Sequence, residues 1–558
     1  MKFVRLLEGL AVFFAFFILI FLFHRIDGRP SGSDTWMYMN TSLNNLAQTF
    51  IPFRYFHVYV QKFFLELAPS PLDGSSWFYA FQMSLLACLA YLNARLLPKN
   101  NGLIHGSLAA ISFLLLPLIL ESAGDPLIDF SAAVMVMVFV TIYNIYFRVA
   151  GKPRLICLFL LGAVFYLALN TKETTICLCI LFLGVFIDNG RVSLSRGWQK
   201  ILAITLGGVC GLLVLAFFNG IFLKDPLFSL RISTLLAQKD LNETVHRVST
   251  VQNWYSNHIF VTYTPLFLLF ILAGYKQRND LPLETRLLWL VPLALVIVLT
   301  FTLLPRGWGL TPRYFFPAIP IICFLFPQFL NFDFLNEKKD LARFALAVAA
   351  FALASIGVVY ALERTAAKLD WDFSNFLSGI WNPIVFSIML MTILFIQRPT
   401  YFINAILIIG LLLLNAYSIR TTVKYLVFGS SGQSKDTFNW YFHPYISFRD
   451  QIDFSPNMTF LVPANLYSDY GLLGNNEDEV KDMYNIYFDT SAVRANFNYE
   501  RDASNLADDL INNNYTYAFM HMSDWLNISG QPTVESAILA KYSLAYDPLN
   551  ILVLFTHK

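Results

Sequence analysis

Residues 201–222, ILAITLGGVCGLLVLAFFNGIF, form an apolar run of the length that crosses a lipid bilayer as a helix. A transmembrane helix needs about 20 mostly apolar residues, and runs of this kind recur from residue 3 to residue 420. Of the 558 residues, 56% are hydrophobic, 16% are aromatic and only 14% are charged. This composition excludes an ordinary soluble domain and predicts a polytopic α-helical membrane protein.

The apolar runs predict about 13 transmembrane helices. The first run begins at residue 3, with Lys2 and Arg5 at its start, and ends at His24 without a small-residue cleavage site, which predicts a retained helix with a cytoplasmic N-terminus. The expected spans are 3–23, 76–94, 103–120, 126–147, 155–170, 173–187, 201–222, 258–274, 287–304, 314–331, 342–360, 380–396 and 401–419.

Basic residues and sequons indicate which loops face the cytoplasm. Basic clusters fall in alternate loops, as the positive-inside rule expects of cytoplasmic segments, and an odd number of spans then places loops 24–75 and 223–257 and the tail outside. The basic clusters are Arg95/Lys99, Arg148/Lys152/Arg154, Arg191/Arg196/Lys200, Lys276/Arg278/Arg286, Lys338/Lys339/Arg343 and Arg398. The Asn-x-Ser/Thr sequons, all on the predicted outer face, start at Asn40, Asn242, Asn457, Asn514 and Asn527.

Charge and cysteine content narrow the partners and the compartment. The net charge of +2 and the lack of a basic run give no sign of nucleic-acid binding, so membrane lipids are the expected surroundings. Every cysteine lies in a predicted span, which predicts buried thiols. Their absence from the tail favours a bacterial plasma membrane, with the endoplasmic reticulum as the alternative. They are Cys88, Cys157, Cys177, Cys179, Cys210 and Cys323.

The composition changes after Arg420, where Ser, Gly, Asn and Asp become frequent. Alternating strand and helix signals predict a small extracytoplasmic α/β domain over 421–558, following a transmembrane domain over 1–420. It has no Gly-rich phosphate loop and no nucleophile elbow, so we expect a structural or substrate-gating role. The predicted elements are strands at 458–462, 484–488, 515–521 and 551–555 and helices at 501–513 and 533–541.

Loop 24–75 carries the first candidate site residues. Asp34 lies a few residues beyond the first span and can act as a general base, although after Ser33 it can equally cap a helix. The aromatic stretch 50–67 predicts a helix in the membrane interface. Its Arg54 and Lys62 can face lipid headgroups or hold a lipid phosphate.

A short outer turn at 121–129 concentrates acidic residues. Glu121, Asp125 and Asp129 have no Lys or Arg near them in sequence. Carboxylates at a membrane boundary are costly unless they are hydrated, paired or functional, which favours a site that faces a cavity. Asp125, before Pro126, also suits a helix cap.

Two further outer turns supply cations. Lys172 can pair with a nearby carboxylate such as Glu173 or Asp125, or contact substrate. Arg306 and Arg313 can bind phosphate, because the guanidinium fork offers paired donors. The alternative is an interfacial belt of Arg, Trp and Tyr residues, which would include Tyr314.

In this order, these motifs resemble those of the GT-C superfamily of polyprenyl-phosphate-sugar glycosyltransferases, especially the branch with protein mannosyltransferases and aminoarabinose transferases. The resemblance rests on Asp34 after the first span, the Asp125-Pro-Leu turn, the Thr171-Lys172 turn, Arg313-Tyr314-x-x-Pro317 and the α/β tail. It spans the whole chain and implies a GT-C-like fold. The motifs are short, so the resemblance depends on their order and sidedness.

The resemblance implies a role for each matching residue. Asp34 would take the proton from the acceptor, and Asp125 would orient the acceptor or a divalent metal ion. Lys62 and the Arg313-Tyr314 motif would bind the donor phosphate. Many relatives have a second acidic residue after the first, whereas Thr35 stands here. A role that needs an acidic pair is therefore not supported.

The expected activity is transfer of a sugar from a polyprenyl-phosphate donor to a glycan, lipid or protein on the non-cytoplasmic face. A lipid or solute transporter and a non-catalytic assembly subunit of the same fold are the alternatives. Transporters show ionisable residues near mid-bilayer and related halves. Here the acidic residues cluster at outer turns and no repeat is evident, which favours the enzyme.

Overall fold

The chain divides into two compact units in the computed structural model. The first unit contains Met1–Arg25, Phe50–His57 and Tyr79–Gly432, and the second contains Ile26–Thr49, Val58–Phe78 and Gln433–Lys558. The structure describes residues 2–23, 38–39, 41–43, 54–69, 71–97, 103–114, 127–188, 191–192, 197–229, 274–275, 281–303, 312–325, 452, 458–463, 496–500, 503–546 and 552–558.

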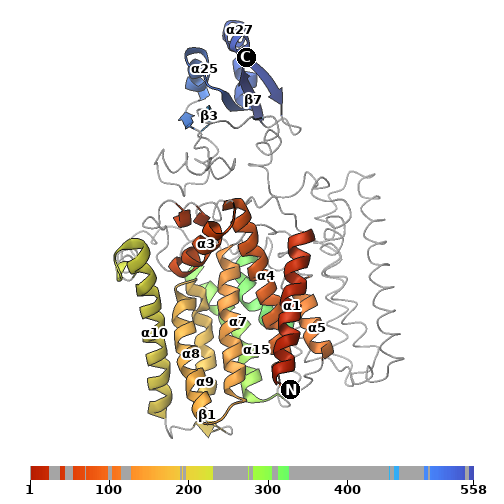
Figure 1. Ribbon diagram of the computed structural model, residues 1–558, viewed down its shortest axis with the longest axis vertical. Coiled ribbons are helices and arrows are strands. Elements are labelled where there is room, and N and C mark those ends of the chain that lie inside the picture. The colour runs from red at the N-terminus through yellow and green to blue at the C-terminus, as the bar shows by residue number, and fades with distance from the viewer. Residues whose placement is uncertain are drawn as a thin grey trace, which may run out of the picture. The chain divides into compact units, whose positions relative to one another are not determined.

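Helices predominate in the described part of the first unit, and α3 and α4 each have residues in both units (Figure 1). Three of the described helices, α7, α8 and α10, are long and apolar enough to cross a membrane. Most described helices coincide with predicted spans, whereas 258–274 apart from its last residue, 342–360, 380–396 and 401–419 lie outside the described residues, so the total of 13 stays a prediction. The helices are α1 (Lys2–Phe23), α3 (Tyr55–Leu67), α4 (Pro71–Leu96), α5 (Leu103–Leu114), α7 (Ile128–Tyr146), α8 (Lys152–Leu169), α9 (Cys179–Val185), α10 (Gly197–Leu223), α15 (Leu283–Leu303) and α16 (Ile319–Leu325).

Two predicted spans begin as 3-10 helices, for local reasons. η2 (Glu173–Leu178) precedes α9, and the Thr175 hydroxyl donates to the Lys172 carbonyl over 2.8 Å, which favours a tight turn. η4 (Pro312–Ala318) precedes α16 and contains Pro317, which has no N–H to donate to an α-helical bond. Both irregular segments follow predicted outer turns.

Helix α7 lies inside the unit and α10 at its edge. In α7, 67% of the apolar window is buried, against 17% in α10. Ring contacts surround α7: Phe130 meets Phe316 edge-on with centroids 4.5 Å apart, and Phe139 meets Phe182 at 5.5 Å. Such pairs add about 0.5–1.5 kcal/mol beyond the area they bury. The residues that begin α7 are thus enclosed by protein.

Glycines bring α8 and α10 into close contact, and the two helices run side by side in Figure 1. A Cβ on Gly207 would lie 1.8 Å from the Phe159 carbonyl oxygen, and one on Gly162 would lie 2.0 Å from the Ile204 carbonyl oxygen. Small residues allow this backbone approach, which stabilises helix pairs in lipid. The contact fixes α8, whose C-terminal end leads into the Lys172 turn.

Replacing Gly207 with Ala is expected to destabilise the unit by about 1–3 kcal/mol, because the methyl group would meet backbone that cannot move aside. Gly208→Ala is the matched control, since the nearest atom to its Cβ, the Gly162 oxygen, is 4.0 Å away. Thermal unfolding in detergent measures both changes. Equal melting temperatures for the two variants would contradict this description of the interface.

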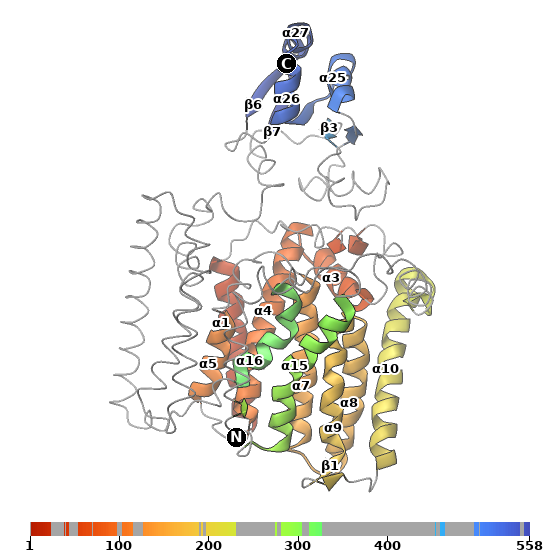
Figure 2. The ribbon, with the colours of Figure 1, turned by 180° about the vertical axis from the view of Figure 1, so that it is seen from behind.

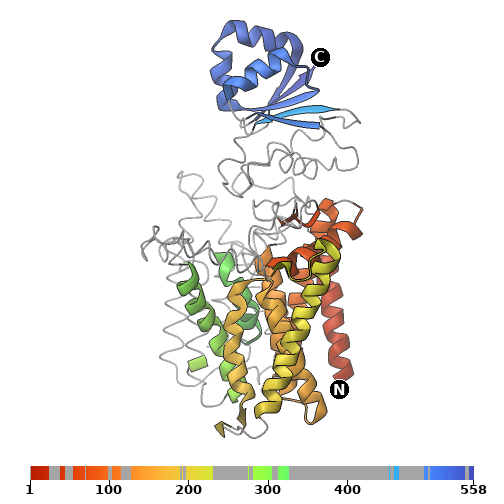
Figure 3. The same cartoon turned by 90° about the vertical axis from the view of Figure 1, so that its left-hand side faces the viewer.

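The described part of the second unit includes a five-stranded sheet in the order β4-β3-β5-β7-β6. Strand β3 is parallel to β4 and β5, whereas β7 is antiparallel to β5 and β6. Helices α25, α26 and α27 lie on one side of the sheet (Figure 3). Their bounds are β3 (Thr459–Pro463), β4 (Asn496–Glu500), α25 (Ala503–Asn512), β5 (Tyr517–His521), α26 (Met522–Ser529), α27 (Pro532–Lys541), β6 (Tyr542–Tyr546) and β7 (Leu552–His557).

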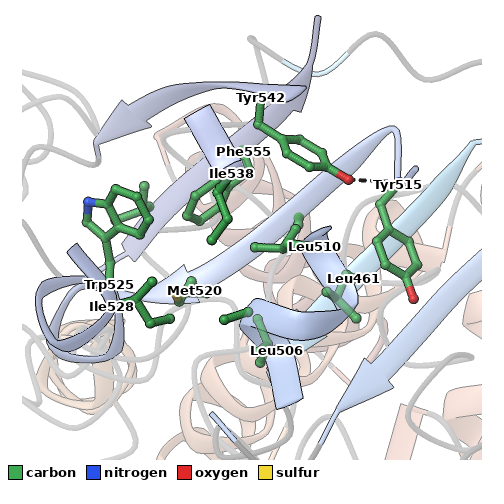
Figure 4. Close-up of a cluster of buried hydrophobic side chains, with 13 residues drawn as sticks. Leu461, Leu506, Leu510, Tyr515, Met520, Trp525, Ile528, Ile538, Tyr542 and Phe555 are labelled. Carbon is green, nitrogen blue, oxygen red and sulfur yellow. Dashed lines mark hydrogen bonds between the residues drawn. The ribbon is translucent and has the colours of Figure 1, made fainter. Parts of the chain in front are cut away.

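A single apolar cluster joins these helices to the sheet (Figure 4). Leu510 of α25 and Ile538 of α27 are fully buried against Phe555 of β7. The Tyr542 hydroxyl accepts from the Tyr515 N–H over 3.1 Å and donates to the Asn513 carbonyl over the same distance. A buried phenol therefore keeps its polar end satisfied within an apolar core.

The elements of the tail correspond in part to the predicted ones. β3, β5, β7, α25 and α27 lie at predicted positions, whereas β4, β6 and α26 had no predicted counterpart. β4 has the sequence Asn-Phe-Asn-Tyr-Glu, and Asn is depleted in strands, which hides the signal. The predicted strand 484–488 lies outside the described residues. The boundary at residue 421 and the extracytoplasmic position of the tail stay predictions.

Candidate functional site

A buried ion pair joins the start of α7 to the turn after α8. The Lys172 Nζ donates to Asp129 Oδ1, and the two residues are only 2% and 1% exposed. The turn is tight: the Lys172 N–H donates to the Ala168 carbonyl over 2.9 Å, after which Lys172 adopts an extended conformation. Asp129 lies in the first turn of α7, where a carboxylate also complements the helix dipole.

An aromatic ring from η4 contacts the cation of the ion pair. The Lys172 ammonium lies 4.6 Å from the centroid of the Tyr314 ring, which is within cation–π range. Away from water, such a contact contributes about 2 kcal/mol. Three segments far apart in sequence therefore meet at Lys172.

Arg54, immediately before α3, is a second buried cation, only 7% exposed. Burial lowers the pKa of the Lys172 ammonium, the Asp129 carboxylate opposes this shift, and the Arg54 charge adds to it, with a smaller opposing effect from Glu173. The Phe56 N–H donates to the Asn170 carbonyl over 3.4 Å, which ties the start of α3 to the Lys172 turn. A guanidinium offers five N–H donors and suits phosphate recognition.

A hydrogen-bonded chain of uncharged side chains joins α3, α7 and α4. The His57 Nδ1 is 2.7 Å from the Ser131 hydroxyl, which also accepts from the Gln82 amide over 2.6 Å. Burial, and secondarily the Arg54 charge, lowers the pKa of His57 to about 3. His57 is therefore an uncharged imidazole at neutral pH.

Lowering the pH from 7 to 5 is expected to destabilise the helical unit through His57. The unfolded chain binds the proton at an ordinary pKa of 6.5, whereas folded His57 resists it until about pH 3. The contribution of His57 to stability is thus fully present above pH 6.5 and is lost as the pH decreases below that value. At pH 5 the loss is about 2 kcal/mol, since one pKa unit corresponds to about 1.4 kcal/mol.

Thermal unfolding in detergent at both pH values tests this effect in wild type and in His57→Gln, which removes the titration. His557→Gln is the matched control, because His557 is exposed on β7. His57→Gln should lose part of the pH dependence and the control should keep all of it. An identical pH dependence in His57→Gln and wild type would rule out His57 as its source.

Removing one partner of the ion pair is expected to cost about 3–5 kcal/mol, because an uncompensated charge stays buried. Lys172→Met and Asp129→Leu should each destabilise strongly, whereas the double variant should recover most of the loss. Glu66→Gln is the control: its partner Lys62 lies 2.7 Å away, but Glu66 is 55% exposed, so the loss should stay below about 1 kcal/mol. A double-mutant cycle with no coupling would contradict the pairing.

The structure brings together Arg54, Lys172 and Tyr314 of the predicted site residues. Lys62 instead donates to the Ser42 carbonyl over 3.1 Å and pairs with Glu66. The phosphate-binding role expected of Lys62 stays a prediction. Four other predicted residues lie outside the described part of the chain: Asp34, Glu121, Asp125 and Arg306. For Arg313, the structure describes the backbone but not the side chain.

Sequence reasoning had no role for His57, Ser131 or Gln82, and it named Asp129 only as one carboxylate of an acidic turn. One signal was present: Asp129 lies within an otherwise apolar span, where a carboxylate requires a partner. Serine and glutamine carry no comparable signal. Among the described residues, no group of three or more His, Cys, Asp or Glu side chains could hold a metal ion. The metal site expected at Asp34 and Asp125 stays a prediction.

No family model matches the sequence, and no curated protein matches it significantly. Solved structures do match. ArnT from Cupriavidus metallidurans in the apo state is 15% identical, with 99% of this chain and 97% of that chain covered and a TM-score of 0.54. ArnT bound to undecaprenyl phosphate is 16% identical with the same coverage and a TM-score of 0.53. The archaeal oligosaccharyltransferase AglB from Archaeoglobus fulgidus is 11% identical, with 99% and 74% covered and a TM-score of 0.41.

The chain is therefore an integral membrane protein with an ArnT-like fold. Among solved structures, its fold is similar to that of ArnT over nearly the whole length of both chains. The resemblance predicted from the order of the motifs is confirmed at the level of the fold.

Proposed function

We propose that the protein is a glycosyltransferase that moves a sugar from a polyprenyl-phosphate donor to an acceptor on the non-cytoplasmic face. The observation that carries this proposal is the convergence of Arg54, the Lys172–Asp129 pair and the Tyr314 ring on one region of a GT-C fold. The structural neighbour ArnT binds undecaprenyl phosphate, which supports a lipid-phosphate donor.

Arg54 and Lys172 suit stabilisation of the leaving phosphate. When the bond between the sugar and the lipid phosphate breaks, negative charge develops on the departing oxygen, and buried fixed cations stabilise it without reorganising. Asp129 pairs with the Lys172 side chain and opposes the lowering of its pKa by burial. The Tyr314 ring contacts the Lys172 ammonium, and the burial of the pair away from water strengthens its electrostatic interaction.

Asp34 completes the proposal as the general base. It would accept the proton of the acceptor hydroxyl or amine while the acceptor attacks the anomeric carbon. Asp125 would orient the acceptor or hold a divalent ion, and Arg313 would add a donor to the phosphate. A donor tail in the bilayer and a sugar in the outer headgroup layer agree with a site at outer helix ends. The acceptor is a glycan, a lipid or a protein.

Asp34→Asn is expected to lower transfer by roughly 10²–10⁴-fold, the range that a general base contributes. Asp73→Asn is the matched control, since Asp73 belongs to the same loop but is exposed in the first turn of α4. Mass spectrometry of lipid-linked sugars and surface glycans measures the effect in cells carrying each variant or a deletion. Cells with the deletion or with Asp34→Asn should accumulate the lipid-linked sugar donor, and their acceptor should lack one sugar residue.

Two outcomes would contradict the proposal at different levels. Unchanged products in Asp34→Asn, with normal amounts of folded protein, would exclude Asp34 as the base. Unchanged lipid-linked sugars and glycans in the deletion strain would reject glycosyl transfer altogether and favour a transporter or an assembly subunit.

A further inference from the structure

A polar cavity lies in the first unit among helix ends that the proposed function does not use. It has a volume of about 260 Å³ and is lined by Leu97, Asn144, Phe147, Arg148 and Glu284. Leu97 directly follows α4, Phe147 and Arg148 follow α7, and Glu284 belongs to the first turn of α15. The basic loops predict that these ends are cytoplasmic, and Figure 2 shows the N-terminus at the same end of the unit.

Opposite charges face this cavity without pairing. Within the described part of the chain, neither the Arg148 nor the Glu284 side chain forms an ion pair or a side-chain hydrogen bond. Each charge complements the dipole of its own helix end, and this interaction explains why each charge taken alone is stable there. The helix dipoles do not explain why a cation and an anion line one cavity without pairing.

A buried amide supplies a third polar group. Asn144 is 3% exposed, and its Nδ2 donates to the Asn93 Oδ1 over 2.7 Å, while the Asn93 amide donates to Thr141 over 2.7 Å. This bond holds the amide group of Asn144, a residue that lines the cavity, and the carbonyl oxygen of that amide is an acceptor that a ligand can use. The ring of Phe147 supplies an apolar wall.

We propose that this cavity binds the headgroup of a phospholipid of the cytoplasmic leaflet that carries a primary ammonium, as in phosphatidylethanolamine. Arg148 binds the phosphate, and Glu284 with the Asn144 carbonyl accepts hydrogen bonds from the ammonium. The volume is below the roughly 300–1,000 Å³ of sites that enclose a whole drug-sized ligand. It therefore suits a headgroup whose acyl chains remain in the bilayer.

The charge pattern discriminates among headgroups. A primary ammonium has N–H groups for both acceptors, whereas the quaternary ammonium of a choline headgroup has none. An anionic glycerol headgroup would leave Glu284 without a cation. Arg148 is exposed, yet partial desolvation lowers its pKa, with a further lowering by the Arg5 charge, and Glu284 opposes both effects. The nearby Arg5 thus adds positive potential for a phosphate.

Native mass spectrometry of the full chain in detergent, titrated with phosphatidylethanolamine, phosphatidylcholine or phosphatidylglycerol, tests the site. We expect the ethanolamine lipid to bind about tenfold more tightly than the other two, which corresponds to one charge-assisted interaction. Competition with soluble O-phosphoethanolamine tests whether the site binds a lipid or a free phosphate ester. At concentrations equal to those of the lipid, this soluble ester should not displace phosphatidylethanolamine. Equal affinity for all three lipids, or full competition by the soluble ester, would overturn the proposal.

Three variants test the separate roles of Arg148 and Glu284 in lipid binding. Arg148→Ala should weaken every phospholipid about tenfold, whereas Glu284→Gln should abolish only the preference for ethanolamine. Lys152→Ala is the matched control, because Lys152 is an exposed cation of the same loop. If Arg148→Ala does not purify folded, Arg148→Gln replaces it. If Lys152→Ala and Arg148→Ala weaken phospholipid binding equally, the effect is one of general surface charge and the proposed site is wrong. An intact preference for the ethanolamine lipid in Glu284→Gln would contradict the proposal as well.

Discussion

The absence of water from the hydrocarbon core is the constraint on which the first unit depends. Every backbone polar group there must be satisfied within the protein, which requires helices, and every charge must find a partner or leave the bilayer. Both consequences are visible in one place. α7 is an inner apolar helix whose first turn carries Asp129, and this carboxylate is buried only because Lys172 pairs with it. The site is thus assembled where helices end.

Hydropathy alone predicted most of the described helices, because a span of apolar residues has few other stable conformations in lipid. The departures are local. η2 and η4 are 3-10 helices where Thr175 and Pro317 compete with or remove α-helical hydrogen bonds. The strand β4 was missed because its Asn residues carry no strand signal. Its pairing with β3 depends on neighbours that are distant in sequence.

The candidate site was predictable as a region but not as a set of contacts. The sequence predicted Arg54, Lys172 and Tyr314 in segments on the outer face, and the structure places them together. No sequence pattern could select Asp129 over Asp125 as the partner of Lys172, because that choice depends on where α7 begins. The Ser131 bond to His57 likewise arises from the packing of three helices, and serine carries no charge that would reveal it.

The strand order of the second unit has a consequence for how the protein is made. β7, the last strand in the chain, occupies an interior position and pairs with both β5 and β6. The earlier strands therefore keep exposed edges until residues 552–557 have left the ribosome. A chain interrupted by a stop codon before this point would retain the helices but leave β5 and β6 without the partner that joins them. The unpaired strand edges of such a product would promote pairing with other chains and aggregation.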